Sequence, residues 1–256
     1  MVPVLPDLRD RFALLRNVRW RYVLFEFVLI FTAVLMYFLV RGLTEGSPEA
    51  AYENADRIAD FQQRLGFFWE PALQGWMIDY HVLVTFVNWI YIWAHWPVIG
   101  LVALWLVLKR PRDYRVVRNA FLISGGIGLI IFATFPVAPP RFAEPDVVDT
   151  ITEYSSSYRV LQPPALVNEY AAMPSLHFGW NLIIGITLVW KARWLPGKAL
   201  GFVAPPLMFI AIVLTANHYI LDGIVGGIVA LTGLAAALWL RNWRDQRRIQ
   251  SEGVPP

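Results

Sequence analysis

The amino-acid sequence predicts an all-α integral membrane protein: a bundle of six transmembrane helices with an interfacial amphipathic helix between the first two spans. Of its 256 residues, 57% are hydrophobic and 15% are aromatic, whereas only 16% are charged. A soluble domain has roughly 25% charged residues. The apolar residues come in blocks long enough to cross a bilayer. Lysine and arginine gather in alternate connections between these blocks, as in multi-pass membrane proteins.

The chain divides into a basic N-terminus (1–21), a six-helix membrane domain (22–240) and a basic tail (241–256). The first apolar block could instead belong to a signal peptide, but such a core would be shorter and a small-residue cleavage site would follow it. We therefore expect it to remain a membrane helix. The expected spans are Tyr22–Val40, Val82–Leu108, Ala120–Phe135, Leu176–Trp190, Ala199–Ala216 and Tyr219–Leu240.

The connections differ in character. Apolar residues recur at near-helical spacing in Ala51–Gly66, which predicts an amphipathic helix at the membrane interface or a loop helix packed on the bundle. Residues 109–118 read as a basic loop, and Pro136–Met173 as a long, proline-rich loop. Within the fifth span, Pro205 and Pro206 predict a kink or an interruption.

The distribution of positive charge predicts the topology. The two termini and the connections after the second and fourth spans hold 17 of the 22 lysines and arginines. By the positive-inside rule, both termini are cytoplasmic. His177 begins one inward-running span and His218 begins another. Both histidines are therefore expected at the extracytoplasmic side, at similar depth.

Several classes of function are excluded by composition. The chain has no cysteine, so it has no disulfide, thiolate nucleophile or zinc–cysteine site. No metal-spaced carboxylate cluster and no glycine-rich phosphate loop is visible, so we predict chemistry without metal or cofactor. Topology already accounts for the basic loops, so no nucleic-acid partner is expected.

His218 and Asp222 form the first candidate catalytic pair. They are four residues apart, so on a helix they share one face. A carboxylate one turn from an imidazole can hold its N–H and raise the basicity of the other nitrogen. Polar groups of this kind are costly inside a membrane, which favours a functional role. The alternative is a structural pair that joins helices.

His177 belongs to the stretch Met173-Pro174-Ser175-Leu176-His177, which opens another apolar block. We expect Pro174 at the first helical position, with His177 in the first turn. A helix start presents unpaired N–H groups to an anion. Ser175 could bind a phosphate oxygen through its hydroxyl and backbone N–H. A nucleophilic histidine, a second histidine as general acid and an anion cradle together indicate phosphoryl transfer through a phosphohistidine.

Pro-Ser-Leu-His, followed about forty residues later by His-x-x-x-Asp, resembles the type 2 phosphatidic acid phosphatase superfamily. More narrowly, the chain resembles the branch that contains the inositol phosphorylceramide synthases, and the resemblance is strongest over residues 119–240. It implies a lipid phosphate or phospholipid substrate bound at the membrane. It also implies His218 as nucleophile, Asp222 as its partner and His177 as general acid.

Arg141 is the best candidate for a phosphate clamp, because guanidinium matches phosphate with two parallel hydrogen bonds. The run Pro139-Pro140-Arg141 resembles the first motif of the inositol-phosphate transferase branch. Members of the wider superfamily carry an arginine six residues before the nucleophile, where this chain has Ile212. Arg141, with Arg159 as a second candidate, must therefore supply more of the compensating charge.

The site residues leave the outcome of the reaction open. Water as acceptor gives a phosphatase, whereas a polar alcohol or lipid hydroxyl gives a headgroup transferase. A proton-coupled transporter is a further alternative, because His177, His218 and Asp222 could relay protons. His95 lies mid-span, about 20 Å from the outer end of its expected helix at 1.5 Å per residue. We expect it to make a structural hydrogen bond to a neighbouring helix. The oligomeric state is not predicted.

Overall fold

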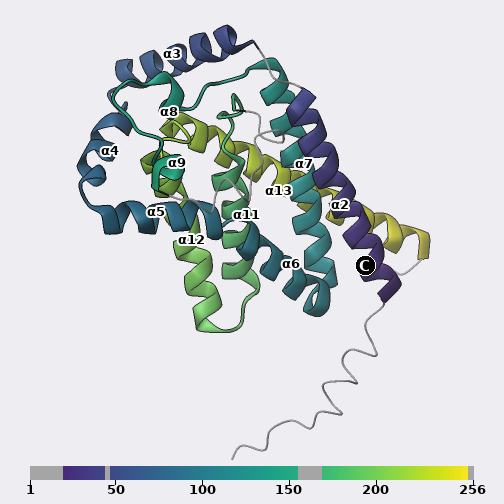
Figure 1. Cartoon of the computed structure of the whole chain (residues 1–256). Helices are drawn as coiled ribbons and strands as arrows, with labels where there is room; N and C mark the ends of the chain where they lie inside the picture. The colour runs from purple at the N-terminus through teal and green to yellow at the C-terminus, as the bar shows by residue number, and fades with distance from the viewer. Residues whose placement is uncertain (1–19, 44–46, 155–168, 253–256) are drawn as a thin grey trace, which may run out of the picture.

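The computed structural model describes residues 20–43, 47–154 and 169–252, and its regular elements are all helices (Figure 1). The all-α class predicted from the sequence is thus confirmed for these residues. The helices are α2 (Trp20–Leu43), α3 (Pro48–Arg64), α4 (Glu70–Ile78), α5 (His81–Trp93), α6 (Trp96–Lys109), α7 (Pro111–Thr134), α8 (Pro140–Ala143), α9 (Thr150–Tyr154), α11 (Leu176–Lys191), α12 (Leu195–Leu214) and α13 (Ile220–Glu252).

Among these residues, 3 helices are long and apolar enough to cross a membrane: Pro111–Thr134, Leu195–Leu214 and Ile220–Ser251. Helices α5 and α6 make a fourth span if the pair, bent by 41°, is taken as one. This indicates an integral membrane protein. Within the 24-residue α2, the apolar stretch with described side chains is Val23–Met36, and this stretch and the 16-residue α11 are shorter than such a span. The expectation of six spans therefore stays a prediction.

The second expected span is broken rather than continuous. Helix α5 ends at Trp93, and α6 begins at Trp96 with a proline in its first turn. Proline has no N–H to donate and its ring clashes with the preceding turn, so a helix restarts more easily at Pro97 than it continues through it. His95 consequently lies at the break, not in the middle of a helix.

One expectation about the connections is wrong. Residues 111–118 are not a loop, because they form the first two turns of α7, again with a proline at the helix start. Helix α12 runs on through Pro205 and Pro206, so of the two alternatives at these prolines the interruption is excluded and the kink stays a prediction. The loop expected at Pro136–Met173 contains α8 and α9 in its described part.

Helix α11 lies in the middle of the bundle and contacts α6, α7, α12 and α13 (Figure 1). Two glycines let α11 and α13 cross closely. A Cβ on Gly226 would lie 2.2 Å from the Ser175 carbonyl oxygen, and a Cβ on Gly179 would lie 2.5 Å from the Gly226 oxygen. Only glycine permits such a backbone approach. The crossing places the start of α11 against the first turns of α13.

Helices α3 and α4 cover the end of the bundle where α11 and α13 begin. Ser47 caps α3, and one face of α3, which includes Ala51, Ala55 and Ile58, is buried in a cluster with Tyr219. The structure thus shows the packed loop helix that we weighed for Ala51–Gly66. Its position at the membrane interface stays a prediction.

Candidate active site

His177 and His218 come together at this end of the bundle, with ring centroids 6.1 Å apart. His177 lies in the first turn of α11, as expected, but Pro174 precedes the helix, whose N-cap is Ser175. His218 is not on α13, which begins two residues later at Ile220. It belongs to the turn between α12 and α13, where Ala216 adopts a left-handed φ of 53°. A non-glycine residue there costs about 1–2 kcal/mol, a cost that the surrounding contacts must offset.

A backbone carbonyl fixes the imidazole of His218. Its Nδ1 lies 2.7 Å from the oxygen of Ala172, whereas the nearest carboxylate oxygen, Oδ2 of Asp222, is 3.7 Å away. A carbonyl oxygen can only accept, so Nδ1 must carry the proton in this contact. The lone pair of the neutral ring is then on Nε2, the nitrogen needed for attack.

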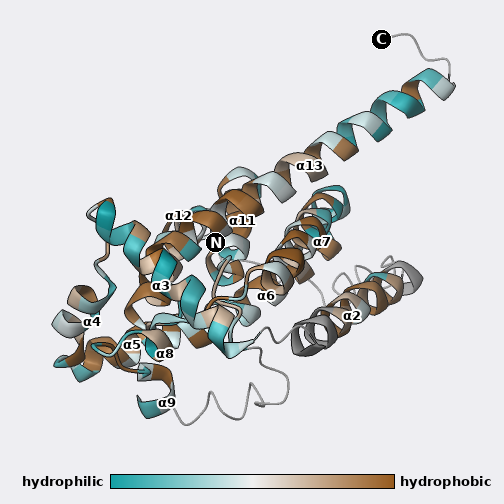
Figure 2. Ribbon diagram, turned by 90° about the horizontal axis from the view of Figure 1, so that it is seen from above, coloured by the Kyte–Doolittle hydropathy of each residue, from teal (hydrophilic) through white to brown (hydrophobic). Residues whose placement is uncertain are grey.

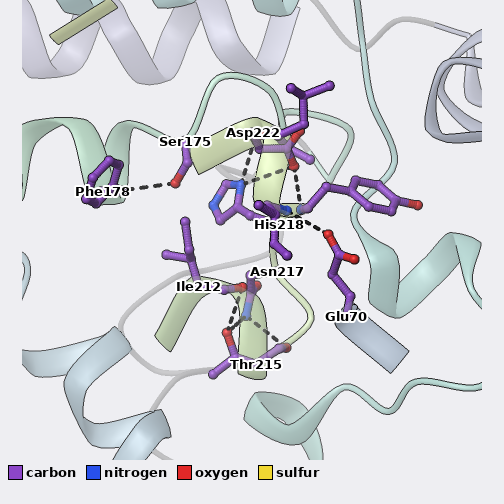
Figure 3. A network of polar contacts seen from close by, with 12 residues as sticks. Glu70, Ser175, Phe178, Ile212, Thr215, Asn217, His218 and Asp222 are labelled. Atoms are coloured by element: carbon purple, nitrogen blue, oxygen red, sulfur yellow. Dashed lines mark hydrogen bonds and ion pairs between the residues drawn. The ribbon is translucent and has the colours of Figure 1, made fainter. Parts of the chain in front are cut away.

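Asp222 is close to His218 but makes its shortest contact elsewhere (Figure 3). Its Oδ2 accepts the backbone N–H of Tyr219 at 2.8 Å, and the side chain is fully buried. The expectation that Asp222 holds the imidazole N–H is thus met only in part, because the Ala172 carbonyl is the nearer acceptor. A buried carboxylate 3.7 Å from Nδ1 can still stabilise positive charge that develops on the ring.

His177 is held by rings on α5 and at the α5–α6 break. It stacks with Tyr91 at 4.6 Å between centroids and with His95 at 4.2 Å. The prediction that His95 hydrogen-bonds a neighbouring helix is confirmed, since its Nδ1 lies 3.1 Å from Asn181 Nδ2 on α11. Sequence reasoning missed its place beside His177, because a continuous span would have carried it far below the site.

Ser175 is buried between α11 and α13. Its hydroxyl oxygen accepts the N–H of Phe178 at 3.5 Å, and its own N–H donates to the Asp222 carbonyl at 2.9 Å (Figure 3). The backbone N–H is therefore engaged, so a contact with phosphate would fall to the hydroxyl. The bond to the Asp222 carbonyl ties the motif of His177 to that of His218.

Arg141 lies on the short helix α8, next to the turn of His218. Its Nη1 donates to Oδ1 of Asn217, and its backbone N–H donates to the Ala216 carbonyl at 3.0 Å. Thr215 fixes the Asn217 amide by accepting from Nδ2 at 2.8 Å. An ion pair of 3.4 Å to Asp149 holds the guanidinium from another direction. Arg159 lies outside the described residues.

Ile212 is fully buried in an apolar cluster with Met77 and Met208. Its carbonyl accepts the N–H groups of Asn217 and His218 at 3.2 and 3.1 Å. The position where relatives carry an arginine thus serves here to shape the turn. Its side chain supplies no cation.

Gln62 and Glu70 cap the start of α13 from α3 and α4, a role that sequence reasoning missed. Glu70 Oε1 accepts the Ile220 N–H at 2.7 Å, and Gln62 Oε1 accepts the Leu221 N–H at 2.8 Å. The two side chains also hydrogen-bond each other at 2.7 Å. Burial raises the pKa of the Glu70 carboxyl above its ordinary value, although these hydrogen bonds offset part of the rise. The sequence signal for this role was the acidic Glu70 placed between the apolar residues Trp69 and Pro71.

Within the described ranges, no group of three or more His, Asp and Glu side chains is placed to hold a metal ion. Metal-free chemistry remains a prediction. The site offers two imidazoles, one buried carboxylate and one guanidinium at one end of a helical bundle. These groups can carry out nucleophilic attack, proton transfer and binding of an anion.

The fold and the site define a helical integral membrane protein with two neighbouring histidines, one in the first turn of α11 and one in the turn before α13. The model of the PAP2 superfamily matches residues 56–236, which is more than half of the chain. The chain belongs to this superfamily, and membership indicates a phosphatase or phosphotransferase. No significant match was found among curated proteins or among solved structures.

Proposed function

We propose that this protein is a lipid phosphate phosphatase or phosphotransferase that works through a phosphohistidine on His218. One observation carries the proposal. The Ala172 carbonyl, 2.7 Å from Nδ1, directs the proton of the neutral ring to that nitrogen and leaves the Nε2 lone pair for attack. The second imidazole, His177, lies close enough for proton transfer, since its ring centroid is 6.1 Å from that of His218.

The first step forms the covalent intermediate. Nε2 of His218 attacks phosphorus, and an N–P bond forms as the P–O bond to the leaving alcohol breaks. His177 gives its proton to the leaving oxygen, which departs as the neutral alcohol. The positive charge on the phosphorylated imidazole is offset by Asp222, whose carboxylate lies 3.7 Å from Nδ1.

The second step returns the enzyme to its starting state. His177, now neutral, takes a proton from water or from an acceptor hydroxyl. The oxygen attacks phosphorus, the N–P bond breaks and the electron pair returns to Nε2. Water releases inorganic phosphate, whereas a polar alcohol or lipid hydroxyl gives a transferred headgroup. Superfamily membership favours hydrolysis, and the resemblance of Pro139-Pro140-Arg141 to the inositol-phosphate transferase branch favours transfer.

The test is an assay in detergent with no membrane gradient. Purified protein is given a panel of lipid phosphates and candidate alcohols, and released phosphate or transferred headgroup is measured. We expect turnover of at least one lipid phosphate. A transporter that relays protons through His177 and His218 would give no release under these conditions, and that result would contradict the proposal.

The topology is a separate prediction, based on the segregation of 17 of 22 basic residues. The chain has no cysteine, so single cysteines report cleanly. Glu153→Cys, near the site, is expected to react with an impermeant maleimide in intact cells, whereas Asn242→Cys reacts only after permeabilisation. Both positions are exposed. Labelling in the reverse pattern would place the site in the cytoplasm.

Metal dependence is also testable. We expect prolonged dialysis against a chelator to leave the rate unchanged, because the proposed steps use only imidazoles, a carboxylate and a guanidinium. The rate is measured before and after dialysis, with and without added Mg²⁺ or Zn²⁺. A loss that a divalent ion restores would show that metal, and not Arg141, compensates the charge of the phosphate.

A further inference from the structure

His95 stands directly behind the proposed general acid. Its ring stacks on that of His177 with centroids 4.2 Å apart and an interplanar angle of 29°. The His95 ring is also nearly parallel to the ring of Trp180, with ring centroids 6.0 Å apart and an interplanar angle of 4°. Only 2% of His95 is exposed. The break between α5 and α6 is what brings this ring up to the site.

Asn181 determines which nitrogen of His95 carries the proton. Its Nδ2 donates to the His177 carbonyl at 2.9 Å and faces Nδ1 of His95 at 3.1 Å. The carbonyl can only accept, so the amide nitrogen must occupy this position. Nδ1 of His95 is therefore the acceptor, and the proton lies on Nε2. An imidazolium would set an N–H against the Asn181 N–H, so His95 is neutral in this arrangement.

We propose that His95, oriented by Asn181, is a positioning residue for His177, an inference that rests on the proposed function. A neutral ring stacked at 4.2 Å restrains rotation of the His177 imidazole without repelling its proton-bearing form. Its proton then stays aimed at the leaving oxygen. Small misplacements of a catalytic group are expensive, since about 1 Å can cost about a hundredfold in rate.

Dependence on the leaving group tests this role. An alkoxide leaves only if it is protonated, whereas p-nitrophenolate, a weak base, leaves unaided. We expect His95→Ala to lower kcat for a lipid phosphate at least about tenfold more than kcat for p-nitrophenyl phosphate. His95→Phe keeps the ring and should recover part of the loss. His177→Ala should show the same selectivity more strongly.

Asn88→Ala is the matched control. Asn88 lies on α5 and is also buried. Its Nδ2 donates a hydrogen bond to the Thr150 carbonyl at 2.8 Å. Loss of the Asn88 side chain should lower kcat for the lipid phosphate and kcat for p-nitrophenyl phosphate by the same factor. If His95→Ala does the same, His95 is merely structural and the inference is overturned. If wild type releases nothing from either substrate, the proposed function has failed instead.

A basic cavity lies at the opposite end of α13, about 28 Å along the helix from Asp222 at 1.5 Å per residue. It has a volume of about 350 Å³ and lies between the start of α7 and the C-terminal part of α13. In Figure 2 this part of α13 is mostly hydrophilic and extends beyond the other helices. The charged residues that line it are Arg112, Arg115, Arg241, Arg244, Asp245 and Arg248.

The charge of this cavity is poorly compensated. Five arginines face one acidic side chain, Asp245, and none of these arginines takes part in an ion pair with the described residues. Like charges gathered around one cavity repel each other. The positive-inside rule requires basic residues on this side but does not require two helices to direct them into one cavity. The arrangement is that of an anion site.

The position of the cavity relative to the bilayer indicates which anion it binds. Trp239 and Trp243 stack on each other within the stretch of α13 that lines the cavity, which runs from Ala237 to Arg248, and Trp239 is 64% exposed. Exposed tryptophans mark the bilayer interface. We infer that the cavity binds the phosphate headgroup of an anionic phospholipid in the adjoining leaflet. Arginine suits this ligand because its fork pairs with phosphate oxygens.

Native mass spectrometry of the detergent-purified protein with added phosphatidylglycerol tests this site. Arg115→Ala with Arg244→Ala is expected to lower lipid retention at least about tenfold relative to wild type. The control, Arg193→Ala with Lys198→Ala, removes the same charge from the connection between α11 and α12 and from the first turn of α12, and should retain the lipid. Equal losses would mean unspecific attraction. Displacement of the lipid by inorganic phosphate alone would mean a soluble anion site, and either result overturns the inference.

Discussion

His218→Ala is expected to abolish turnover of every phosphate substrate, with a loss on the order of 10³-fold or more. In the proposed mechanism the variant removes the atom that forms the N–P bond, and no other described imidazole is held in the same geometry by the Ala172 carbonyl. Activity is measured as release of phosphate from the best lipid phosphate. The fold is checked by the thermal unfolding midpoint and by gel filtration.

His81→Ala is the control for this loss. His81 lies at the start of α5, its ring is 5.9 Å from that of Tyr154, and it is exposed. We expect its removal to leave turnover near wild type. A second measurement, acid-labile radioactive labelling from a labelled lipid phosphate, should be lost in His218→Ala. A well-folded His218→Ala that keeps more than about a tenth of wild-type turnover would show that another residue is the nucleophile.

The helical class and the pairing of the two histidine motifs could be predicted from the sequence. Long apolar blocks predict helices because a bilayer offers no partner for unpaired backbone groups. Two spans that run in the same direction begin at the same membrane surface. Side chains from motifs at their starts are therefore expected to lie at similar depth and close together. This rule alone predicts that His177 and His218 lie close together, and their ring centroids are 6.1 Å apart.

The break at His95 could not be predicted with the same rule. Hydropathy treats Val82–Leu108 as one block, because the long apolar stretches on both sides of Pro97 outweigh the few less apolar residues beside it. Proline inside a membrane helix is often tolerated, as it is within α12 at Pro205. Which proline ends a helix depends on tertiary contacts. Here the break lets His95 stack on His177 and hydrogen-bond Asn181.

The partners of the candidate catalytic groups could not be predicted from the sequence either. The acceptor for His218 is the backbone carbonyl of Ala172, and a carbonyl leaves no trace in residue identity. The cap of α13 comes from Gln62 and Glu70, about 150 residues away along the chain. Local spacing carries no information about such contacts. It predicted Asp222 as the partner because that residue is four positions from His218.

Arg141→Ala is expected to lower turnover at least about a hundredfold, with a smaller effect on KM. Ile212 is buried where relatives carry an arginine, so the charge of the phosphate needs another cation. Arg141 is placed for this, since its guanidinium contacts Asn217, the neighbour of His218. Charge moves onto the equatorial phosphate oxygens in the transition state, where two parallel hydrogen bonds tighten.

Arg141→Lys keeps the charge but loses the fork, so it should still cost about tenfold or more. Asp149 holds Arg141 at 3.4 Å, and an incoming phosphate must compete with it. The control for loss of a positive charge on the same side is Arg57→Ala, whose side chain is 69% exposed on α3 and which should behave as wild type. Steady-state kinetics of these variants and of Arg159→Ala decide the assignment. If both Arg141 variants run near wild type while Arg159→Ala fails, Arg159 is the clamp, and Arg141 serves only to hold the turn of His218.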